Sequence, residues 1–397
     1  MKRRSFLRST LALGALGATG CCFLPSELEA PIPSAPSTVP PTTSAVLASP
    51  APTEWVPAQT VVLAVGILRW ARADLYDAMP AEERRDQALV EALVARGVPR
   101  SRITYLVDEQ ATLARAREAL AASIAACGPD DTFVFYWAGH GDRTDAGASY
   151  AVPFDAGDDS ARTCLGYDEI ARAIERGGMG RALSFADTCY SGALADALVA
   201  RRGGPMRAGF GASSASESST GNWTFTDAVI AAFGGDANAD RDRDGSVTLT
   251  DLERFVEEEM AFADGQLANV QCTSDFPRTF RLAGAAAPPC VRYGERLEVL
   301  DEGTWWPATI IGQPGTQLAV HYDGYTGSSD AVVDVSQTRP YAPLTYAAGT
   351  RVEVRWEGQW YPAAIRDQRL GVHLVHYDGF ADTWDEWVSS DRIRVPT

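Results

Sequence analysis

Histidine and cysteine are scarce in this sequence, with four and seven copies among 397 residues. One of the four histidines is His140, and the other three lie in the C-terminal quarter. His140 is therefore the only candidate catalytic base before residue 283. Seven cysteines are too few for a disulfide scaffold in a chain of this length. Cys272 and Cys290 fit either one disulfide or two separate thiols.

The N-terminal apolar stretch, residues 9–20, is too short to cross a bilayer, and with the basic residues before it predicts an export signal over 1–22. The segment from Arg3 to Arg8 resembles the twin-arginine signal, although paired arginines also occur by chance. Gly17-Ala-Thr-Gly-Cys21 resembles a lipobox, which implies an exported, membrane-anchored lipoprotein with acyl chains on Cys21; an ordinary cleaved signal is the alternative. Residues 23–59, rich in Pro, Ser and Thr, predict a linker.

Basic residues are outnumbered, with 35 Lys and Arg against 52 Asp and Glu and a formal net charge of −17. Four of the basic residues lie in the signal, so a processed chain carries 31 basic against 52 acidic residues, about −21. This charge disfavours nonspecific nucleic-acid binding, and we expect no nucleic-acid partner. It favours basic peptides or proteins as partners, although acidity also serves solubility.

Strand and helix patterns alternate over residues 60–283. Buried strands are expected at 60–68, 103–107, 132–137 and 181–186, with helices at 82–96, 111–126 and 167–176. Strands that alternate with helices predict a mostly parallel sheet covered on both faces, an α/β/α sandwich. Two of these strands lead to His140 and Cys189. Thiol catalysis needs a base beside the sulfur, at the carboxyl edge of a sheet where a substrate backbone can reach both, so the pair predicts a nucleophile and its base. A buried cysteine and a core histidine are the alternative.

The segments Ala138-Gly-His140-Gly141 and Asp187-Thr-Cys189-Tyr-Ser-Gly192 resemble the two signatures of the caspase and metacaspase family of cysteine peptidases. This resemblance implies a caspase-like fold over residues 60–283. It implies that Cys189 attacks the scissile carbonyl as a thiolate and that His140 protonates the leaving amine. The backbone N–H groups of Gly141 and Cys189 would form the oxyanion hole. An inactive relative is the alternative, although both catalytic residues are intact.

The same resemblance implies a specificity. In the metacaspase-like group the Asp two residues before the cysteine lines an acidic S1 pocket, so Asp187 implies Arg or Lys at P1 through charge-assisted hydrogen bonds. Asp86, in the first helix, matches a second acid of that pocket by position, with an exposed helix acid as the alternative. Family members are processed after the cysteine strand, which predicts self-cleavage after Arg202 or Arg207.

Residues 240–251 carry acids at positions 1, 3, 5 and 12 of a twelve-residue loop, and Gly at position 6. This spacing fits an EF-hand calcium loop between helices at 225–233 and 249–260. The predicted ligands of one Ca²⁺ ion are Asp240, Asp242, Asp244, the Ser246 carbonyl and Asp251. The ion is either regulatory, switching the peptidase on after export, or structural; a solvated acidic turn is the alternative.

Residues 291–340 and 346–397 repeat one another at an offset of 55. Trp305-Trp-Pro-Ala308 recurs as Trp360-Tyr-Pro-Ala363, and His321-Tyr-Asp-Gly324 recurs as His376-Tyr-Asp-Gly379. Short alternating segments between turn residues predict two small β-barrels, which resemble the tudor-like and chromo-barrel group of SH3-like modules.

The second repeat is rich in aromatic residues that suit either a peptide groove or the core of a small barrel. The candidate groove residues are Trp360, Tyr361, Tyr377, Phe380, Trp384 and Trp387. The first repeat has Ser329 and Val332 where the second has Trp384 and Trp387, so we expect its groove to be poorer. A basic or methylated peptide, a cell-envelope component or the peptidase itself would be the ligand.

These patterns predict an exported, lipid-anchored cysteine endopeptidase that cleaves peptides or proteins after Arg or Lys. It would consist of a caspase-like α/β/α sandwich with one calcium loop, followed by two SH3-like barrels. The alternative is an inactive caspase-like envelope adaptor that binds peptides through its barrels.

Overall fold

A computed structural model describes residues 53–80, 84–144, 146–215, 222–325, 327–356 and 358–396. The predicted signal, Cys21 and most of the predicted linker lie outside these residues. The last residues of the predicted linker, 53–59, are described by the structure. Trp55 is buried there, and its ring packs edge-on against Phe233 at 4.8 Å. Within the described ranges, no helix has the length and apolar character needed to span a membrane.

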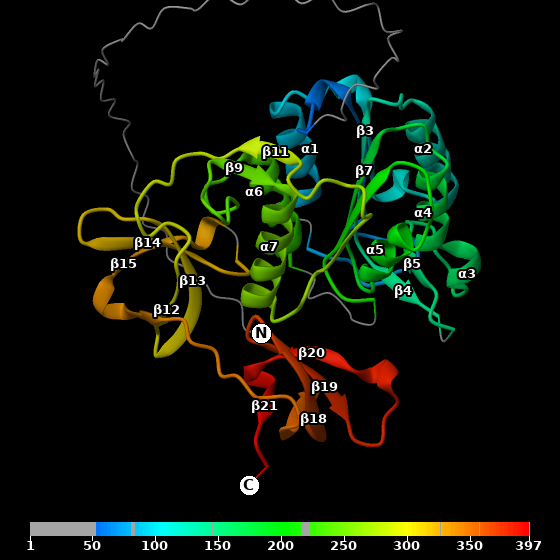
Figure 1. Ribbon diagram of the computed structural model, residues 1–397. Helices are drawn as coiled ribbons and strands as arrows, with labels where there is room; N and C mark the ends of the chain where they lie inside the picture. The colour runs from blue at the N-terminus through cyan, green and yellow to red at the C-terminus, as the bar shows by residue number, and fades with distance from the viewer. Residues whose placement is uncertain are drawn as a thin grey trace, which may run out of the picture. The chain divides into compact units, whose positions relative to one another are not determined.

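A six-stranded sheet forms the centre of residues 60–283, in the order β10-β8-β7-β3-β1-β2. Its middle strands β3 and β7 are labelled in Figure 1. Five strands are parallel: β1 (Thr60–Gly66), β2 (Ile103–Val107), β3 (Thr132–Ala138), β7 (Arg181–Asp187) and β8 (Met206–Gly211). The sixth, β10 (Asn269–Cys272), pairs antiparallel with β8 at one edge. Strands β1, β3 and β7 are buried along their whole length, because helices cover both faces, and this is why they are continuous apolar runs.

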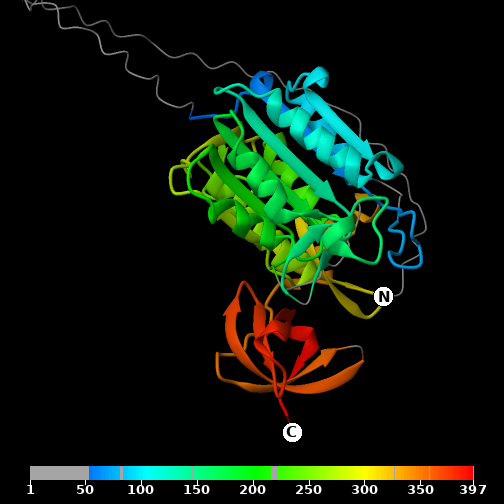
Figure 2. The ribbon, with the colours of Figure 1, turned by 90° about the vertical axis from the view of Figure 1, so that its right-hand side faces the viewer.

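Helices pack on both faces of this sheet, as the rotated view in Figure 2 shows. Helices α1 (Arg85–Ala95), α6 (Thr224–Gly234) and α7 (Leu249–Glu259) share one apolar core with alternate strand residues such as Val62 and Phe185. Helices α2 (Leu113–Ala125), α4 (Tyr167–Glu175) and α5 (Gly192–Val199) share the other core with Leu63 and Trp137. The predicted α/β arrangement with a mostly parallel sheet is therefore confirmed.

Smaller elements extend this framework. A three-stranded sheet, β4 (Gly141–Arg143), β5 (Ser149–Ala151) and β6 (Leu165–Gly166), follows His140, and the short helix α3 (Ser160–Thr163) precedes β6. Strand β9 (Ser246–Thr248) pairs with β11 (Arg281–Gly284) beside the predicted calcium loop.

Two curled five-stranded antiparallel sheets form the C-terminal part, as the repeats predicted. The first contains β12 (Arg296–Asp301), β13 (Thr304–Gly312), β14 (Gln317–Tyr322), β15 (Ala331–Asp334) and β16 (Thr338–Pro340). The second contains β17 (Arg351–Trp356), β18 (Gln359–Arg369), β19 (Val372–Tyr377), β20 (Glu386–Ser389) and β21 (Ile393–Arg394). Each encloses its own small apolar core, as expected for a small barrel.

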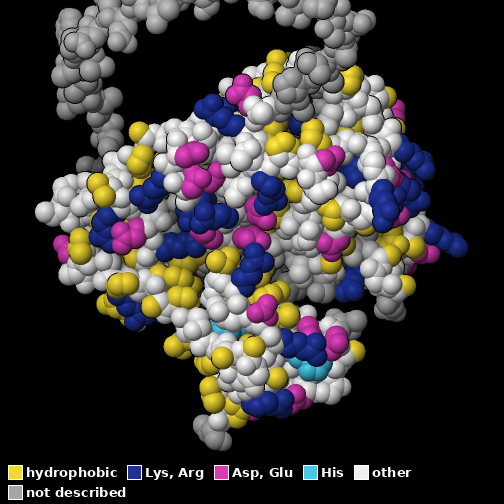
Figure 3. Space-filling model, in the orientation of Figure 1, with side chains coloured by type: hydrophobic (Ala, Val, Ile, Leu, Met, Phe, Trp, Pro, Cys, Tyr) yellow, Lys and Arg dark blue, Asp and Glu magenta, His cyan; other side chains and the backbone are white. Residues whose placement is uncertain are grey.

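Cys272 and Cys290 are separate thiols, because no disulfide joins the cysteines that the structure describes. The Cys272 sulfur instead accepts a hydrogen bond from the Arg278 guanidinium at 3.0 Å. On the face drawn in Figure 3, acidic and basic side chains are interspersed, and no patch of a single sign dominates it.

Candidate active site

The parallel pairing of β3 and β7 brings the two predicted catalytic residues to one edge of the sheet. Ala138 pairs with Asp187 at the carboxyl ends of these strands, and His140 and Cys189 each follow two residues later. The turns that carry them touch at Gly141, where an added Cβ would lie 2.0 Å from the Cys189 carbonyl oxygen. Only glycine fits at this approach, so the histidine and cysteine turns are packed against each other.

The imidazole of His140 is held from one side by the segment after β1. Its Nε2 lies 2.9 Å from the Asp77 carbonyl oxygen, and the rings of Trp70 and Tyr76 lie 4.3 and 5.8 Å from it, centroid to centroid. A carbonyl oxygen only accepts hydrogen bonds, so Nε2 carries the proton of the neutral ring. The other nitrogen, Nδ1, is then the one that can accept a proton.

Cys189 lies half-buried in a sharp turn between β7 and α5. The next residue, Tyr190, has a left-handed backbone with φ +59°, which costs roughly 1–2 kcal/mol for a residue with a side chain. The Ser213 carbonyl pins the turn by accepting from the Gly192 N–H at 2.9 Å, and the Ser213 N–H donates to Ser191 Oγ at 3.1 Å. The turn is thereby fixed against the end of β8.

The carboxylate of Asp187 is buried on the α6 side of the sheet. It accepts a hydrogen bond of 2.6 Å from Thr226, whose hydroxyl also lies 2.7 Å from that of Tyr136. Burial is the main reason that the pKa of Asp187 rises to about 7, and the nearby charges of Asp264 and Asp227 raise it further. Near neutral pH this group is therefore balanced between its charged and neutral forms.

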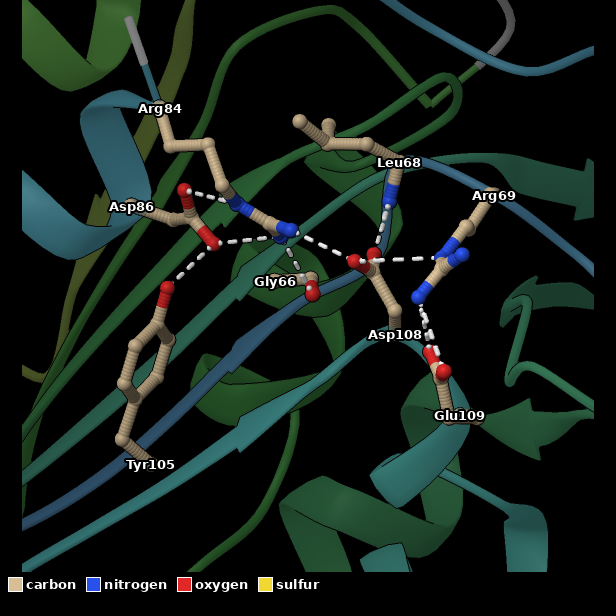
Figure 4. Close-up of polar contacts among 8 residues, drawn as sticks. All are labelled: Gly66, Leu68, Arg69, Arg84, Asp86, Tyr105, Asp108 and Glu109. Atoms are coloured by element: carbon tan, nitrogen blue, oxygen red, sulfur yellow. Dashed lines mark hydrogen bonds and ion pairs between the residues drawn. The ribbon is translucent and has the colours of Figure 1, made fainter. Parts of the chain in front are cut away.

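Asp86 lies on the same side of the sheet, against Gly66 at the end of β1. Gly66 pairs with Ala138 of β3, and Ala138 pairs with Asp187 of β7, so the two acids lie two strands apart at the same edge. Figure 4 shows that Arg84 donates to both Asp86 oxygens, at 3.1 and 2.9 Å, and the Tyr105 hydroxyl donates at 2.7 Å. The Asp86 side chain is fully buried, so the ordinary alternative of an exposed helix acid is wrong. Its charge is already paired within the chain.

Arg84 lies beside the predicted S1 residues, although no sequence motif pointed to it. Besides Asp86, its guanidinium donates to the Gly66 carbonyl at 2.8 Å and to Asp108 at 2.7 Å (Figure 4). Asp108 also accepts from the Leu68 N–H at 2.9 Å. This network ties the segment after β1 to the ends of β1 and β2, beside the predicted S1 residues.

The two predicted processing residues differ in accessibility. Arg202 is exposed, in a turn between α5 and β8. Arg207 lies within β8, is 2% exposed, and donates to four backbone carbonyls. In the folded protein the Arg207 side chain cannot enter another site without breaking the strand, so Arg202 is the more accessible of the two predicted cleavage sites.

The predicted calcium loop folds so that its first three acids converge. Carboxylate oxygens of Asp240, Asp242 and Asp244 lie within 4.8 Å of one another. Gly245 has φ +89° and open space around it, as the turn at position 6 requires. Asp251 accepts from the N–H groups of Arg241 and Thr248 at 3.1 and 2.9 Å, so part of its lone-pair capacity is used within the loop.

The carboxylates of this loop lie close enough together for a cation to be stabilised between them. Partial desolvation, followed by the charges of Asp251, Asp244 and Asp240, raises the pKa of Asp242. An all-oxygen set of this kind suits a hard divalent ion. A second group of possible ligands, His376, Asp382 and Asp385, is a poorer candidate, because its two aspartates already pair with the Arg366 guanidinium.

Five aromatic rings form a cage on the second barrel. The rings of Trp356, Tyr361, Phe380 and Trp384 make a closed circuit, with centroids 5.8 to 6.4 Å apart and edge-to-face contacts. Tyr377 is buried beneath and contacts Tyr361 and Phe380. Trp356, Phe380 and Trp384 are 41, 45 and 55% exposed. Such a cage suits a cation that is bound by ring faces.

Two predicted groove residues are not part of this cage, and one member was missed. Trp360 points to the other side of β18 from Tyr361, and the Arg394 guanidinium lies 4.1 Å from its ring centroid. Trp387 packs against Ala261, Leu267 and Val372 instead. The missed member is Trp356, at the end of β17.

Residues 347–395 match the family model named Tudor-knot, described as the RNA binding activity-knot of a chromodomain. The second barrel is therefore a Tudor-knot, chromodomain-like domain. Over 54 residues the chain is 41% identical to the chromatin modification-related protein EAF3 of Mycosarcoma maydis, covering 13% of this chain and 15% of that protein. Over 78 residues it is 33% identical to the chloroplastic carbamoyl phosphate synthase small chain of Arabidopsis thaliana, covering 19% and 18%. The chain thus spans less than a fifth of these curated relatives.

Among solved structures, protein GSU0716 from Geobacter sulfurreducens is similar over 57% of this chain and 100% of its own length, with 16% identity and a TM-score of 0.43. The Arabidopsis thaliana protein AGDP1 (AGD34) is similar over 26% of this chain and 81% of its own length, with 16% identity and a TM-score of 0.14.

Proposed function

We propose that this protein is a cysteine endopeptidase of the metacaspase-like group, with a caspase-like fold over residues 60–283. The observation that supports this most is the contact between the His140 and Cys189 turns at the carboxyl edge of the sheet. The Asp77 carbonyl adds to it, because it leaves Nδ1 of His140 as the proton acceptor.

In this proposal Nδ1 of His140 takes the proton of the Cys189 thiol, and the thiolate attacks the scissile carbonyl carbon. The N–H groups of Gly141 and Cys189 donate to the oxyanion. The protonated imidazole then gives its proton to the leaving amine. Water attacks the acyl-enzyme with His140 as base, which releases the acid product and restores the thiol.

Asp187 is the residue that we propose recognises Arg or Lys at P1. Asp86 lies nearby, but Arg84 already balances its charge. A substrate cation must displace Arg84 to reach Asp86, whereas at Asp187 it meets a carboxylate that accepts hydrogen bonds from Thr226 and forms no ion pair within the described ranges. The cost of burying that carboxylate falls when a cation binds, which favours a basic P1 residue.

Calcium binding at residues 240–251 is part of the proposal. Asp240, Asp242 and Asp244 would supply carboxylates, with the Ser246 carbonyl and Asp251 completing the set. A bound ion would relieve the repulsion within the loop and hold the start of α7. We also propose export and lipid anchoring at Cys21.

The test is hydrolysis of fluorogenic peptides that differ only in Arg, Lys or Asp at P1, by the full chain with calcium. Cys189→Ala and His140→Ala should abolish turnover of the Arg and Lys peptides, and the Asp peptide should resist the wild-type protein. The proposal would be wrong if folded wild-type protein hydrolysed none of the three peptides, or if the Cys189→Ala protein kept its activity.

The aromatic cage favours a second function, the binding of a basic or methylated peptide by the second barrel. This function stands even if the peptidase domain is inactive, as in an envelope adaptor. Residues 347–395 carry six arginines against eight acidic residues, so their charge favours a basic peptide over RNA.

A further inference from the structure

The two barrels use an equivalent pair of residues in different ways. In the second barrel the guanidinium of Arg351 donates to both carboxylate oxygens of Asp378, to one of them at 2.9 Å. The period of 55 places Arg296 and Asp323 at these positions in the first barrel. The backbone agrees, since the N–H of each aspartate donates to a proline carbonyl in the second strand of its barrel, at 3.3 Å for Asp323 and 2.9 Å for Asp378. Arg296 and Asp323 nevertheless form no hydrogen bond or ion pair with each other in the described ranges.

Arg296 instead reaches out of its barrel to the α/β domain of residues 60–283. It donates to Glu259, the last residue of α7, at 2.7 Å, and its guanidinium carbon lies 4.3 Å from the ring centroid of Phe262. Phe262 belongs to the π-helical turn Met260–Asp264 that continues α7, and Tyr341, just after β16, packs edge-on against it at 4.4 Å. With the barrel in this position Phe262 is only 6% exposed. The first barrel is thus docked on the end of α7 by one ion pair and two ring contacts.

This choice of partner leaves Asp323 buried without a guanidinium bound to it. The residue is 6% exposed, and its Oδ1 accepts a hydrogen bond from the Thr309 hydroxyl at 3.0 Å. Its Oδ2 is buried and accepts no hydrogen bond within the described ranges. Burial first, and then the charge of Glu259, raise the pKa of Asp323 to about 7. The side chain of Asp378, by contrast, is 33% exposed and keeps its arginine.

The glycine after each aspartate shows the same difference between the barrels. Gly324 and Gly379 both have a left-handed backbone, with φ +77° and +81°. An added Cβ at Gly324 would lie 3.8 Å from the Ala263 carbonyl oxygen and 3.8 Å from the Asn222 side-chain nitrogen, both in the α/β domain. An added Cβ at Gly379 would meet nothing within 4 Å. At this position only the first barrel touches the α/β domain.

We propose that the first barrel docks reversibly on the surface formed by Glu259 and Phe262, and that Arg296 exchanges Asp323 for Glu259 when it docks. In the undocked state the barrel would have the arginine–aspartate pair that the second barrel shows. A barrel with an incomplete aromatic cage would thereby bind its own chain rather than a peptide. This inference goes beyond the peptidase function and does not depend on turnover.

Docking should strengthen as the pH falls. In the docked state the carboxyl of Asp323 takes up a proton below about pH 7, whereas in the undocked state, exposed and paired with Arg296, its pKa would lie no higher than the ordinary 3.8. The docked state therefore binds the extra proton between about pH 4 and pH 7, and the docking constant rises by up to about tenfold for each pH unit of acidification in this range. The groups that face this carboxyl are Arg296 from β12, Thr309 from β13, His321 from β14 and Glu259 from α7.

His321 acts in the same direction. Its pKa is raised first by the hydrogen bond with Asp330, and further by the charges of Asp323 and of Asp227 in the α/β domain. The interaction with Asp227 exists only while the barrel is docked. Protonation of His321 therefore also favours the docked state.

Thiol labelling of the full chain measures docking, in a Cys189→Ala background that removes the proposed catalytic thiol. The cysteine introduced by Gly324→Cys would have its Cβ in the contact and should react slowly while the barrel is docked. Gly379→Cys is the matched control in the second barrel and should react freely. The ratio of the two rates, measured with a dipyridyl disulfide and assigned by mass spectrometry, cancels the effect of pH on the thiol itself. It should fall about tenfold between about pH 6 and pH 5 and become constant above about pH 7.

Arg296→Gln and Glu259→Gln, each added to Gly324→Cys, remove the ion pair from either side. Both should raise the labelling rate at about pH 5 at least tenfold, whereas Arg351→Gln, at the equivalent arginine of the second barrel, should leave it unchanged. Circular dichroism shows whether each variant is folded. Two folded variants that both label as slowly as their parent would overturn the exchange of partners.

Asp323→Asn tests the origin of the pH dependence. An amide carries no charge to bury, so this variant should label almost as slowly at about pH 8 as at pH 5. A pH dependence that persists undiminished in Asp323→Asn, or equal labelling at positions 324 and 379 at every pH, would overturn the proposal. Because no readout uses turnover, failure of the peptidase function leaves these outcomes unchanged.

Discussion

The imidazole Nε2 of His140 lies 2.9 Å from the backbone carbonyl oxygen of Asp77, in the segment that follows β1. The contact fixes the proton on one ring nitrogen through the backbone, so it does not depend on the side chain at position 77. The orientation of the ring depends instead on the indole of Trp70, which lies 4.3 Å away and is almost fully buried.

Asp77→Ala should therefore keep kcat near the wild-type value, and Trp70→Ala should lower it roughly tenfold or more, because a tilted imidazole is a poor base. Steady-state kinetics on an Arg-P1 peptide measures both. Trp70→Phe should recover part of the loss. An Asp77→Ala protein as slow as Trp70→Ala would show that the carboxylate itself takes part.

Gly141→Ala should lower turnover about a hundredfold while the protein stays folded. The new Cβ would lie 2.0 Å from the Cys189 carbonyl oxygen, a backbone atom that cannot move aside without displacing the thiol. A shift of about 1 Å costs on the order of a hundredfold in rate. Gly157→Ala is the control, because its Cβ would meet only Thr163, at an ordinary 3.5 Å. Equal activity in the two variants would contradict this packing.

The raised pKa of Asp187 predicts opposite effects of pH on binding and on stability. Below about pH 7 the carboxyl is neutral, so the Kd of the Cys189→Ala protein for an arginine peptide should rise as the pH falls. In the unfolded chain the pKa is near 3.8, so between about pH 4 and pH 7 the folded state binds the extra proton and loses stability as the pH rises.

Asp187→Asn should then stabilise the protein at pH 8 by a few kcal/mol, with no gain at pH 4, and should abolish the preference for Arg at P1. Urea unfolding at the two pH values measures the first effect, and kcat/KM on matched peptides the second. A stability difference that is the same at both pH values would show that burial of the charge is not its cause.

Calcium should raise the melting temperature of the full chain by a few degrees when present at about a hundred times its Kd. Asp242→Asn should remove this rise, because its carboxylate is one of the three that converge. Asp236→Asn, just outside the loop, should keep it. A rise that persists in Asp242→Asn places the ion elsewhere, and peptidase activity that is unchanged by excess chelator favours a structural ion.

The cage predicts a preference for a trimethylated lysine peptide over the unmodified one, measured by calorimetry. Phe380→Ala and Trp384→Ala should each weaken binding about tenfold, as expected for the loss of a ring face to a cation. Trp360→Ala is the matched control, because this ring stacks on Arg394 outside the cage. Tighter binding of single-stranded RNA than of the peptide would contradict a peptide reader.

The central strands could be predicted because a strand covered on both faces must be a continuous apolar run, as in residues 132–138. Strand β10 could not, because an edge strand of four half-buried residues has no such run. His140 and Cys189 followed from motifs at strand ends. Asp77 and Arg84 had no such signal: one contributes a backbone carbonyl and the other an ion pair, and both depend on the path of a loop.

The cage could be predicted in part from the comparison of the two repeats. Tyr361, Phe380 and Trp384 belong to it, but the period of 55 places Asp301 at the position of Trp356, so the comparison of the repeats gave no hint of that ring. The error over Trp360 was avoidable, because consecutive residues in a strand face opposite sides and only one of Trp360 and Tyr361 can face the groove.

The two barrels are more alike in their backbone and internal hydrogen bonds than in the aromatic residues of the cage. In each, the histidine Nδ1 hydrogen bonds to an aspartate nine residues later, His321 with Asp330 at 2.6 Å and His376 with Asp385 at 2.7 Å. In each, the pairing of the second and third strands shifts register at the same place, after Ile310 and after Ile365, which are 55 residues apart.

The first barrel already has Trp306 and Tyr325 in edge-to-face contact at 6.0 Å, where the second has Tyr361 and Phe380. Asp301→Trp and Ser329→Trp would supply the two missing rings. Two side chains therefore decide how many cages the chain has. With one cage it would bind one modified residue at a time. With two cages it would bind a multiply modified partner by avidity, at an effective concentration set by the short connection between the barrels.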